Sequence, residues 1–228
     1  MKHRIDVKGV IVPNDYADFY EWAGEDYTCP NMVSSAIDKS SPGDEIAVYI
    51  NSPGGVIDCG SEIYTMLREA SADRDVKIYI TGQACSAASV IACAAYSEMS
   101  PTALMMVHCV SSGVIGNHND MEQMAETLKI ADHALCQAYV QKTGMSEEEA
   151  LAMMEAETWL SAKQAKEIGL VDAIMFDESE NDLMVAAIGL KLPTQEELEQ
   201  ARKALKADDL TAKRRRIIEA IKVAPARA

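Results

Sequence analysis

The stretch Ile78-Tyr-Ile-Thr-Gly-Gln-Ala-Cys-Ser86-Ala-Ala-Ser-Val-Ile91 predicts a β-strand that turns, through small residues, into an apolar helix. Ser86 lies at the corner between them. A hydroxyl at such a corner is close to the amino terminus of a helix, where unpaired N–H groups stabilise developing negative charge. Small neighbours also leave room for a substrate carbonyl. Ser86 is therefore a candidate serine nucleophile.

Strand and helix signals alternate around this corner. Residues 46–50 and 76–80 are short β-rich runs, and each is followed by a glycine-bearing turn and a helical stretch, at 58–70 and 89–95. A third strand is predicted over Thr102–His108, and it ends on a histidine. This order is typical of an α/β protein with a parallel sheet.

A long amphipathic helix is predicted over residues 118–142. Its apolar residues recur at steps of three or four: Met121, Met124, Leu128, Ala131, Leu135 and Tyr139. Two interpretations stay open, because such a helix can lie on the core or can project and pair with another subunit. Further on, Ser146 and Ser161 are predicted N-caps of two short helices, and residues 170–174 resemble a strand.

Charge divides the chain into two parts. The net charge is −15, yet residues 177–228 contain ten acidic and ten basic side chains, so the whole excess lies in residues 1–176. We expect residues 1–176 to be the functional domain and residues 177–228 to be a charged, helical extension. An acidic domain argues against nucleic acid as a partner. The basic run 213–216 fits either a solvated helical face or a contact with an acidic partner.

Composition narrows the class of protein further. At 48% hydrophobic residues, the 228-residue chain can bury one sizeable core. It has no apolar run of about 18 residues to span a bilayer, and its start does not read as a signal core. We expect a cytoplasmic protein with no membrane partner. The six cysteines form no Cys-x-x-Cys pair and fit free thiols in a reducing compartment, so no zinc, other metal or cofactor is expected.

A second motif, Asn51-Ser-Pro-Gly-Gly-Val-Ile57, is predicted as a strand end followed by a turn with two glycines, which permits close approach of a ligand to the backbone. With it, the chain resembles the Clp protease proteolytic subunit, the ClpP-like serine peptidases, over about residues 44–176. Five motifs carry the resemblance in the family's order: Asn51 to Ile57, Gly82-Gln-Ala-Cys-Ser-Ala-Ala88, Met106-Val-His108, Trp159-Leu-Ser-Ala162 and Gly169-Leu-Val-Asp172.

The resemblance implies the Clp/crotonase fold, which stacks strand-strand-helix units and carries a projecting oligomerisation helix. It also implies protein or peptide substrates and a homo-oligomer, as one heptameric ring or two stacked rings. Mapped onto this sequence, the family's nucleophile is Ser86 and its general base is His108. An imidazole suits that role because it exchanges protons near neutral pH.

The third member of the triad maps onto Glu157, where the family carries an aspartate. A glutamate can also orient an imidazole, although its extra methylene changes the reach. Asp172 is the fallback carboxylate, and Glu157 as an ordinary surface charge remains an alternative. The oxyanion hole maps onto the backbone N–H groups of Gly55 and Ala87. Ala88 stands where family members usually have glycine, which narrows the site.

Residues 1–45 resemble the phage head-maturation branch of the family, which implies processing of capsid or scaffold proteins without an ATPase. We therefore expect an ATP-independent serine endopeptidase. Two alternatives remain: a Clp subunit that works with an ATP-dependent unfoldase, and a proteolytically silent ring that acts as a scaffold. Crotonase-type acyl-CoA chemistry ranks below these, because it needs no pairing of Ser86 with His108. A thiol role for Cys85 also ranks low, because no base is aimed at it.

Overall fold

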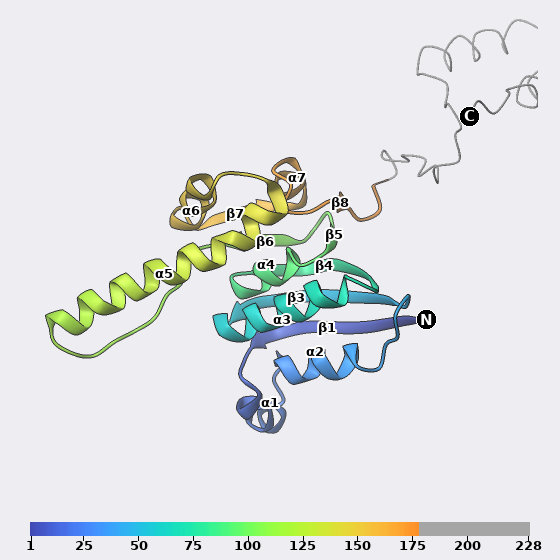
Figure 1. The fold of residues 1–228 in the computed structure, drawn as a ribbon, viewed down its shortest axis with the longest axis horizontal. Helices are drawn as coiled ribbons and strands as arrows, with labels where there is room; N and C mark the ends of the chain where they lie inside the picture. The colour runs from blue at the N-terminus through green and yellow to red at the C-terminus, as the bar shows by residue number, and fades with distance from the viewer. Residues whose placement is uncertain (178–228) are drawn as a thin grey trace, which may run out of the picture. The chain divides into compact units, whose positions relative to one another are not determined.

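A sheet of mostly parallel strands lies at the centre of the protein (Figure 1). The computed structural model describes residues 1–177, and within them eight strands form one sheet in the order β2-β1-β3-β4-β5-β8, with β6 paired to β4 and β7. Only the pairing of β6 with β7 is antiparallel among these described strands. The strands are β1 (Lys2–Ile11), β2 (Tyr27–Thr28), β3 (Glu45–Gly55), β4 (Asp75–Cys85), β5 (Tyr96–Met99), β6 (Leu104–Val107), β7 (Thr158–Ser161) and β8 (Ala173–Ile174).

Helices connect the strands, as parallel pairing requires. They are the 3-10 helix η1 (Asn14–Tyr16) and the α-helices α1 (Ala17–Ala23), α2 (Pro30–Ile37), α3 (Ile57–Ala70), α4 (Ala87–Ala92), α5 (His118–Thr143), α6 (Glu147–Glu155) and α7 (Ala162–Glu167). The α/β class with a parallel sheet is thus confirmed, and the repeated strand and helix units match the Clp/crotonase architecture.

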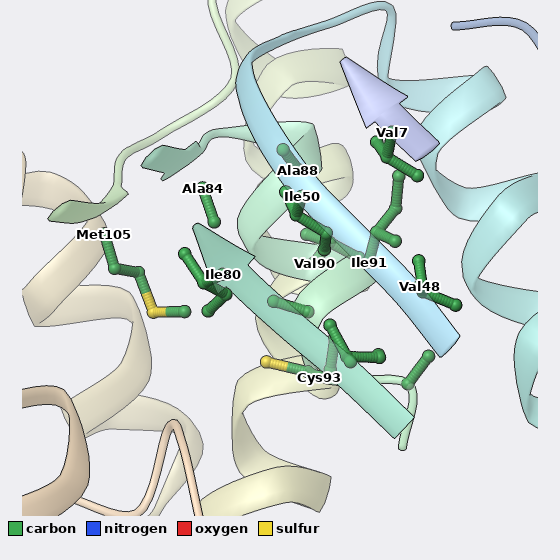
Figure 2. Close-up of a cluster of buried hydrophobic side chains, with 14 of the residues drawn as sticks. Val7, Val48, Ile50, Ile80, Ala84, Ala88, Val90, Ile91, Cys93 and Met105 are labelled. Carbon is green, nitrogen blue, oxygen red and sulfur yellow. The ribbon is translucent and has the colours of Figure 1, made fainter. Parts of the chain in front are cut away.

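The hydrophobic core fills the space between the central strands and α4 (Figure 2). Val48, Ile50 and Ile80 are fully buried, and so is Ile91 of the facing helix. Burying each such aliphatic side chain contributes about 1.5–3 kcal/mol. The helix that follows Ser86 is therefore anchored by its apolar side chains, which fixes the position of the corner itself.

Strands β3 and β4 are longer than predicted. The sequence predicts turns at Pro53-Gly-Gly55 and after Ile80, whereas both segments continue their strands. The register between β3 and β4 shifts between Ile50 and Ser52, and the Asn51 side-chain oxygen accepts a hydrogen bond of 3.2 Å from the Gln83 N–H there. The side chain thus satisfies a backbone group at the irregularity, which allows the glycines to remain in the sheet.

Two other predicted boundaries are wrong. The helix predicted at 89–95 occupies Ala87–Ala92, so it begins directly after Ser86. The strand predicted at 170–174 is reduced to Ala173–Ile174, because the Leu170 N–H donates to the Ala165 carbonyl (2.8 Å) in the turn that ends α7. The predicted N-caps are confirmed, since Ser146 and Ser161 both form capping boxes.

Helix α5 both packs on the core and projects from it, and its pairing with another subunit stays a prediction. Its carboxyl-terminal part packs on the core, where Cys136 and Tyr139 are buried. Its amino-terminal part extends beyond the sheet (Figure 1), and Ile130 is 71% exposed there. The helix therefore projects.

None of the helices in residues 1–177 combines the length and apolar character needed to cross a bilayer. The predicted charged extension at 177–228 lies outside the described residues, apart from Asp177.

Candidate active site

Ser86 occupies the predicted corner between β4 and α4. Its backbone adopts φ 55° and ψ −127°, in the positive-φ region that residues with a side chain rarely enter. The Ser86 N–H donates to the Met106 carbonyl of β6 at 2.9 Å, which holds the corner against the neighbouring strand. Strain at a half-buried serine is typical of functional sites, where the surrounding structure maintains it.

His108 directly follows the last residue of β6, and the pairing of β6 with the end of β4 brings it close to Ser86. Strand β6 runs parallel to the end of β4, with Cys85 opposite Met106. Ser86 and His108 line the same cavity of about 50 Å³, and Gly55 and Ala87 line it too. The structure thus brings together four of the five residues predicted for the triad and the oxyanion hole.

Glu157 does not line that cavity, and it directly precedes β7, the strand that pairs with β6. Strands β6 and β7 pair antiparallel as far as Val107 opposite Thr158, and His108 and Glu157 are the residues that adjoin this last pair. Glu157 is exposed, has φ 47°, and its N–H donates to the Met154 carbonyl at 3.1 Å. Among residues 1–177, only Ser86, Glu157 and Phe176 have positive φ without being glycine.

Asp172, the fallback carboxylate, has a different set of contacts. Its Oδ2 accepts hydrogen bonds from the Ser97 N–H at 2.7 Å and from the Lys142 ammonium. The Lys142 side chain is only 9% exposed and also donates to the Ala95 carbonyl. Asp172 therefore ties β5 to the end of α5, and it does not line the Ser86 cavity.

Two glycines allow the end of β3 to lie close to its neighbours, the Ser86 corner and β1. A methyl group on Gly54, which has φ 94°, would lie 2.6 Å from the Cys85 carbonyl oxygen and 2.7 Å from the Ser86 Cβ. A methyl group on Gly55 would lie 2.1 Å from the Ile11 oxygen. Glycine at position 54 is therefore required for the close approach to the Ser86 corner, and glycine at position 55 is required for the close approach to β1.

Ser52 holds the backbone at Gly54 in place through hydrogen bonds. Its fully buried hydroxyl donates to the Gly9 carbonyl at 2.6 Å and accepts from the Gly54 N–H at 3.1 Å. Gly9 marks an irregularity in β1, where the register shifts between Lys8 and Val10. Ser52 was not a predicted site residue, because one hydroxyl within a glycine motif gives no signal for a contact with a residue distant in sequence.

Ser89 and Tyr139 connect the corner to α5. The Ser89 hydroxyl donates to the Ser86 carbonyl at 2.6 Å and lies 2.8 Å from the Tyr139 hydroxyl. Because a carbonyl can only accept, the single Ser89 proton is used there and the Tyr139 hydroxyl donates to the Ser89 oxygen. Burial raises the pKa of Tyr139, which keeps this donor protonated.

Ala88 and Cys85 need no catalytic role. Ala88 is fully buried in the core between the sheet and α4. Cys85 is also buried, and burial raises the pKa of its thiol, which disfavours the reactive thiolate. All six cysteines are free thiols. Within residues 1–177, no group of three or more histidine, cysteine, aspartate or glutamate side chains could hold a metal ion.

Fold and site together define an α/β protein with a strained serine at a strand-to-helix corner. His108 lines the same cavity as Ser86, and so do Gly55 and Ala87. The chain belongs to the Clp protease family, whose model, described as Clp protease, matches residues 28–178.

The sequence is similar to those of two Clp protease proteolytic subunits. The sequence is 34% identical over 152 residues to the ATP-dependent Clp protease proteolytic subunit 1 of Chlamydia muridarum, covering 64% of this chain and 77% of the relative. It is 31% identical over 156 residues to the ATP-dependent Clp protease proteolytic subunit of Bacteroides fragilis, covering 66% and 74%.

The fold is also similar to that of a solved structure, a mutant of ClpP1 from Listeria monocytogenes. The TM-score is 0.61 at 22% identity, with coverage of 78% of this chain and 93% of that chain.

Proposed function

We propose that this protein is a serine endopeptidase in which Ser86 is the nucleophile, His108 the general base and Glu157 the carboxylate that orients His108. The observation that carries the proposal is the cavity shared by Ser86, His108, Gly55 and Ala87. A serine hydroxyl becomes a nucleophile when an adjacent imidazole accepts its proton. This set of residues is the minimum that acyl transfer requires.

Each residue has a role in peptide hydrolysis. The Ser86 oxygen attacks the carbonyl carbon of the scissile bond while His108 accepts the Ser86 proton. The backbone N–H groups of Gly55 and Ala87 stabilise the oxyanion that forms, a contribution of roughly 10²- to 10³-fold in rate for one donor. His108 then gives the proton to the leaving amine, and water hydrolyses the acyl-enzyme by the same path.

Glu157 is the better third member on two grounds. It adjoins Thr158, the residue paired with Val107, just as His108 adjoins Val107, and its positive φ is a strain of the kind that the surrounding structure maintains at functional positions. Asp172 is already engaged by Ser97 and Lys142. Removing Asp172 should therefore affect the stability of the protein more than its chemistry.

We further propose that the protein works without an ATPase, on capsid or scaffold proteins in the manner of the phage head-maturation branch. The family model begins at residue 28, so β1, η1 and α1 lie outside the matched segment. This supports an amino-terminal part with a role of its own. The projecting half of α5 is the surface through which we expect a homo-oligomeric ring to form.

Coupling to an unfoldase is the second candidate function. It is favoured by the two relatives, which are named as subunits of an ATP-dependent Clp protease. In that case, degradation of a folded substrate would require an unfoldase and ATP, whereas hydrolysis of an unfolded substrate would not.

Casein hydrolysis by the wild-type protein and the Ser86→Ala variant tests the proposal. We expect the substitution to abolish hydrolysis and to leave the assembled mass by light scattering unchanged. Cleavage by Ser86→Ala at the wild-type rate would refute the assignment of the nucleophile. An assembled wild-type protein that cleaves nothing would favour the silent scaffold instead.

A further inference from the structure

A polar pocket lies at the carboxyl-terminal end of α4, the helix whose other end is the Ser86 corner. Cys93 and Ala94, which directly follow α4, line it together with parts of α3, β4, β5 and α5. Its volume is about 390 Å³, and ligand pockets in proteins typically measure roughly 300–1,000 Å³. None of the described residues lines both this pocket and the Ser86 cavity, so the two sites are separate.

Basic side chains outnumber acidic ones among the residues that line this pocket. Arg68, Arg74 and Lys142 supply positive charges, whereas only Asp75 and Asp172 among the described residues there supply negative ones. This balance contrasts with the rest of the domain, because residues 1–176 carry the whole acidic excess of the chain. A concave site with an excess of positive charge raises the local concentration of anions. The pocket therefore favours a negatively charged ligand.

Arg68 is the charged group of the pocket with donors to spare. The other charged side chains that line it all have an ion-pair partner: Lys142 pairs with Asp172, Arg74 with Asp73 and Asp75 with Lys77. Arg68 forms no ion pair with any residue in 1–177, and its hydrogen bond to the Ala94 carbonyl is long, at 3.5 Å. A guanidinium carries five N–H donors in a planar fork that fits a carboxylate or a phosphate. Most donors of Arg68 are therefore available to an anion.

The pocket also has room and aromatic surface for an organic group beside the anion. Tyr64 and Tyr96 line it, and the Tyr96 side chain is 46% exposed. Aromatic rings favour stacked or edge-to-face contacts with another ring. A bare phosphate is only a few times larger than a water molecule, whose share of liquid volume is about 30 Å³, so it would leave most of the pocket empty. The ligand that fits both features combines an anionic group with a ring.

We propose that this pocket binds a small phosphate monoester, with the phosphate on Arg68 and the organic group against Tyr96. Phosphate is favoured over carboxylate because a phosphate monoester carries a charge of roughly −1.5 to −2 at pH 7, and so gains more from the nearby Arg74 and Lys142. The ligand is distinct from a peptide substrate, because the pocket is separate from the Ser86 cavity. Its binding does not depend on the proposed peptidase function.

Isothermal titration calorimetry of the full-length protein tests the proposal with phenyl phosphate, inorganic phosphate and phenol. The ionic strength is held constant, because salt screens exposed charges. We expect phenyl phosphate to bind about tenfold more tightly than inorganic phosphate, since burial of the ring adds apolar contact. Phenol should bind at least about tenfold more weakly than phenyl phosphate, since it lacks the charge-assisted hydrogen bonds.

Variants of the pocket separate the two parts of the ligand. Arg68→Ala should weaken the binding of phenyl phosphate and of inorganic phosphate at least about tenfold, because it removes the main donor to the anion. Tyr96→Ala should remove the preference for phenyl phosphate and leave the affinity for inorganic phosphate unchanged. Arg4→Ala is the matched control, because it removes the same charge from an arginine that is 57% exposed and does not line the pocket. It should bind both probes like wild type.

Several outcomes would overturn the proposal. They are no binding of phenyl phosphate by wild type, wild-type affinity in Arg68→Ala, and an equal loss in Arg4→Ala, which would show a general attraction of anions to the chain. Phenol that binds as tightly as phenyl phosphate would show an apolar site instead. If Arg68→Ala lowers the midpoint of urea unfolding, Arg68→Gln decides, because glutamine keeps a donor for the Ala94 carbonyl without the charge. It should also weaken phosphate binding about tenfold.

Discussion

The hydrogen bond between Tyr139 and Ser89 makes a quantitative prediction about how α5 supports the nucleophile corner. Ser89→Ala leaves a buried tyrosine hydroxyl without its acceptor, which costs about 2 kcal/mol of unfolding free energy. Tyr139→Phe removes only a donor, since the Ser89 hydroxyl still donates to the Ser86 carbonyl, and costs about 1 kcal/mol.

The double variant distinguishes a real hydrogen bond from mere proximity. If both hydroxyls are removed, no unpaired group remains at that contact, so the cost should be about 1–2 kcal/mol rather than the sum of about 3 kcal/mol. The assay is urea unfolding at one fixed protein concentration, because assembly shifts apparent stability. Tyr64→Phe is a control, since its hydroxyl bond to Gln141 is exposed and should be worth less than about 0.5 kcal/mol. Strict additivity of the two single substitutions would refute the reasoning.

Three further predictions concern the site and its surroundings. Gly54→Ala should slow hydrolysis roughly 10²-fold, because a methyl group there displaces the backbone beside Ser86. Gly113→Ala is the control and should keep the wild-type rate, because the space around Gly113 is open. Equal rates of hydrolysis by the two variants would contradict the close approach at Gly54. Glu157→Gln should lower kcat about 10²- to 10⁴-fold, and Glu157→Asp should restore part of this loss. Asp172→Asn should lower the free energy of unfolding and leave kcat near the wild-type value. The reverse pattern would show that Asp172, and not Glu157, is the third member of the triad. Hydrogen bonds from Ser146, the larger effect from its N–H and the smaller from its hydroxyl, hold the pKa of Glu149 below its ordinary value. The ionised Glu149 carboxylate therefore stabilises the fold above about pH 4.3, and this contribution is lost as the pH falls through the pKa of the folded state. Glu149→Gln should flatten the pH dependence of urea unfolding in that acid range, and an unchanged slope would argue against the capping interaction.

The central part of the fold was predictable because hydrophobic periodicity reports burial directly. Residues 46–50 and 76–80 are buried strand segments, and the start and end of α5 differ by no more than one residue from the prediction. The extensions of β3 and β4 were not predictable, because Pro53, Gly54 and Gly55 favour a turn locally. Their place in the sheet depends on contacts made by Asn51 and Ser52 with residues distant in sequence.

The amino-terminal elements were missed for a different reason. Strand β1 alternates charged residues with the buried Ile5 and Val7, but several charges made the segment look mixed. Helix α1 has no buried residue, so its aromatic side chains give no core-facing pattern. Local motifs and the family resemblance pointed to Ser86 and His108, and the two residues line one cavity. The bond between Ser89 and Tyr139 joins residues 50 positions apart, and no local pattern predicts such a pair.

The central claim, that Ser86 is an activated nucleophile, is tested most directly by intact-mass analysis after reaction with a fluorophosphonate probe. We predict one label per wild-type chain, no label on Ser86→Ala and slower labelling of Glu157→Ala. Labelling that persists in Ser86→Ala, or a folded wild-type protein that takes no label, would contradict the account.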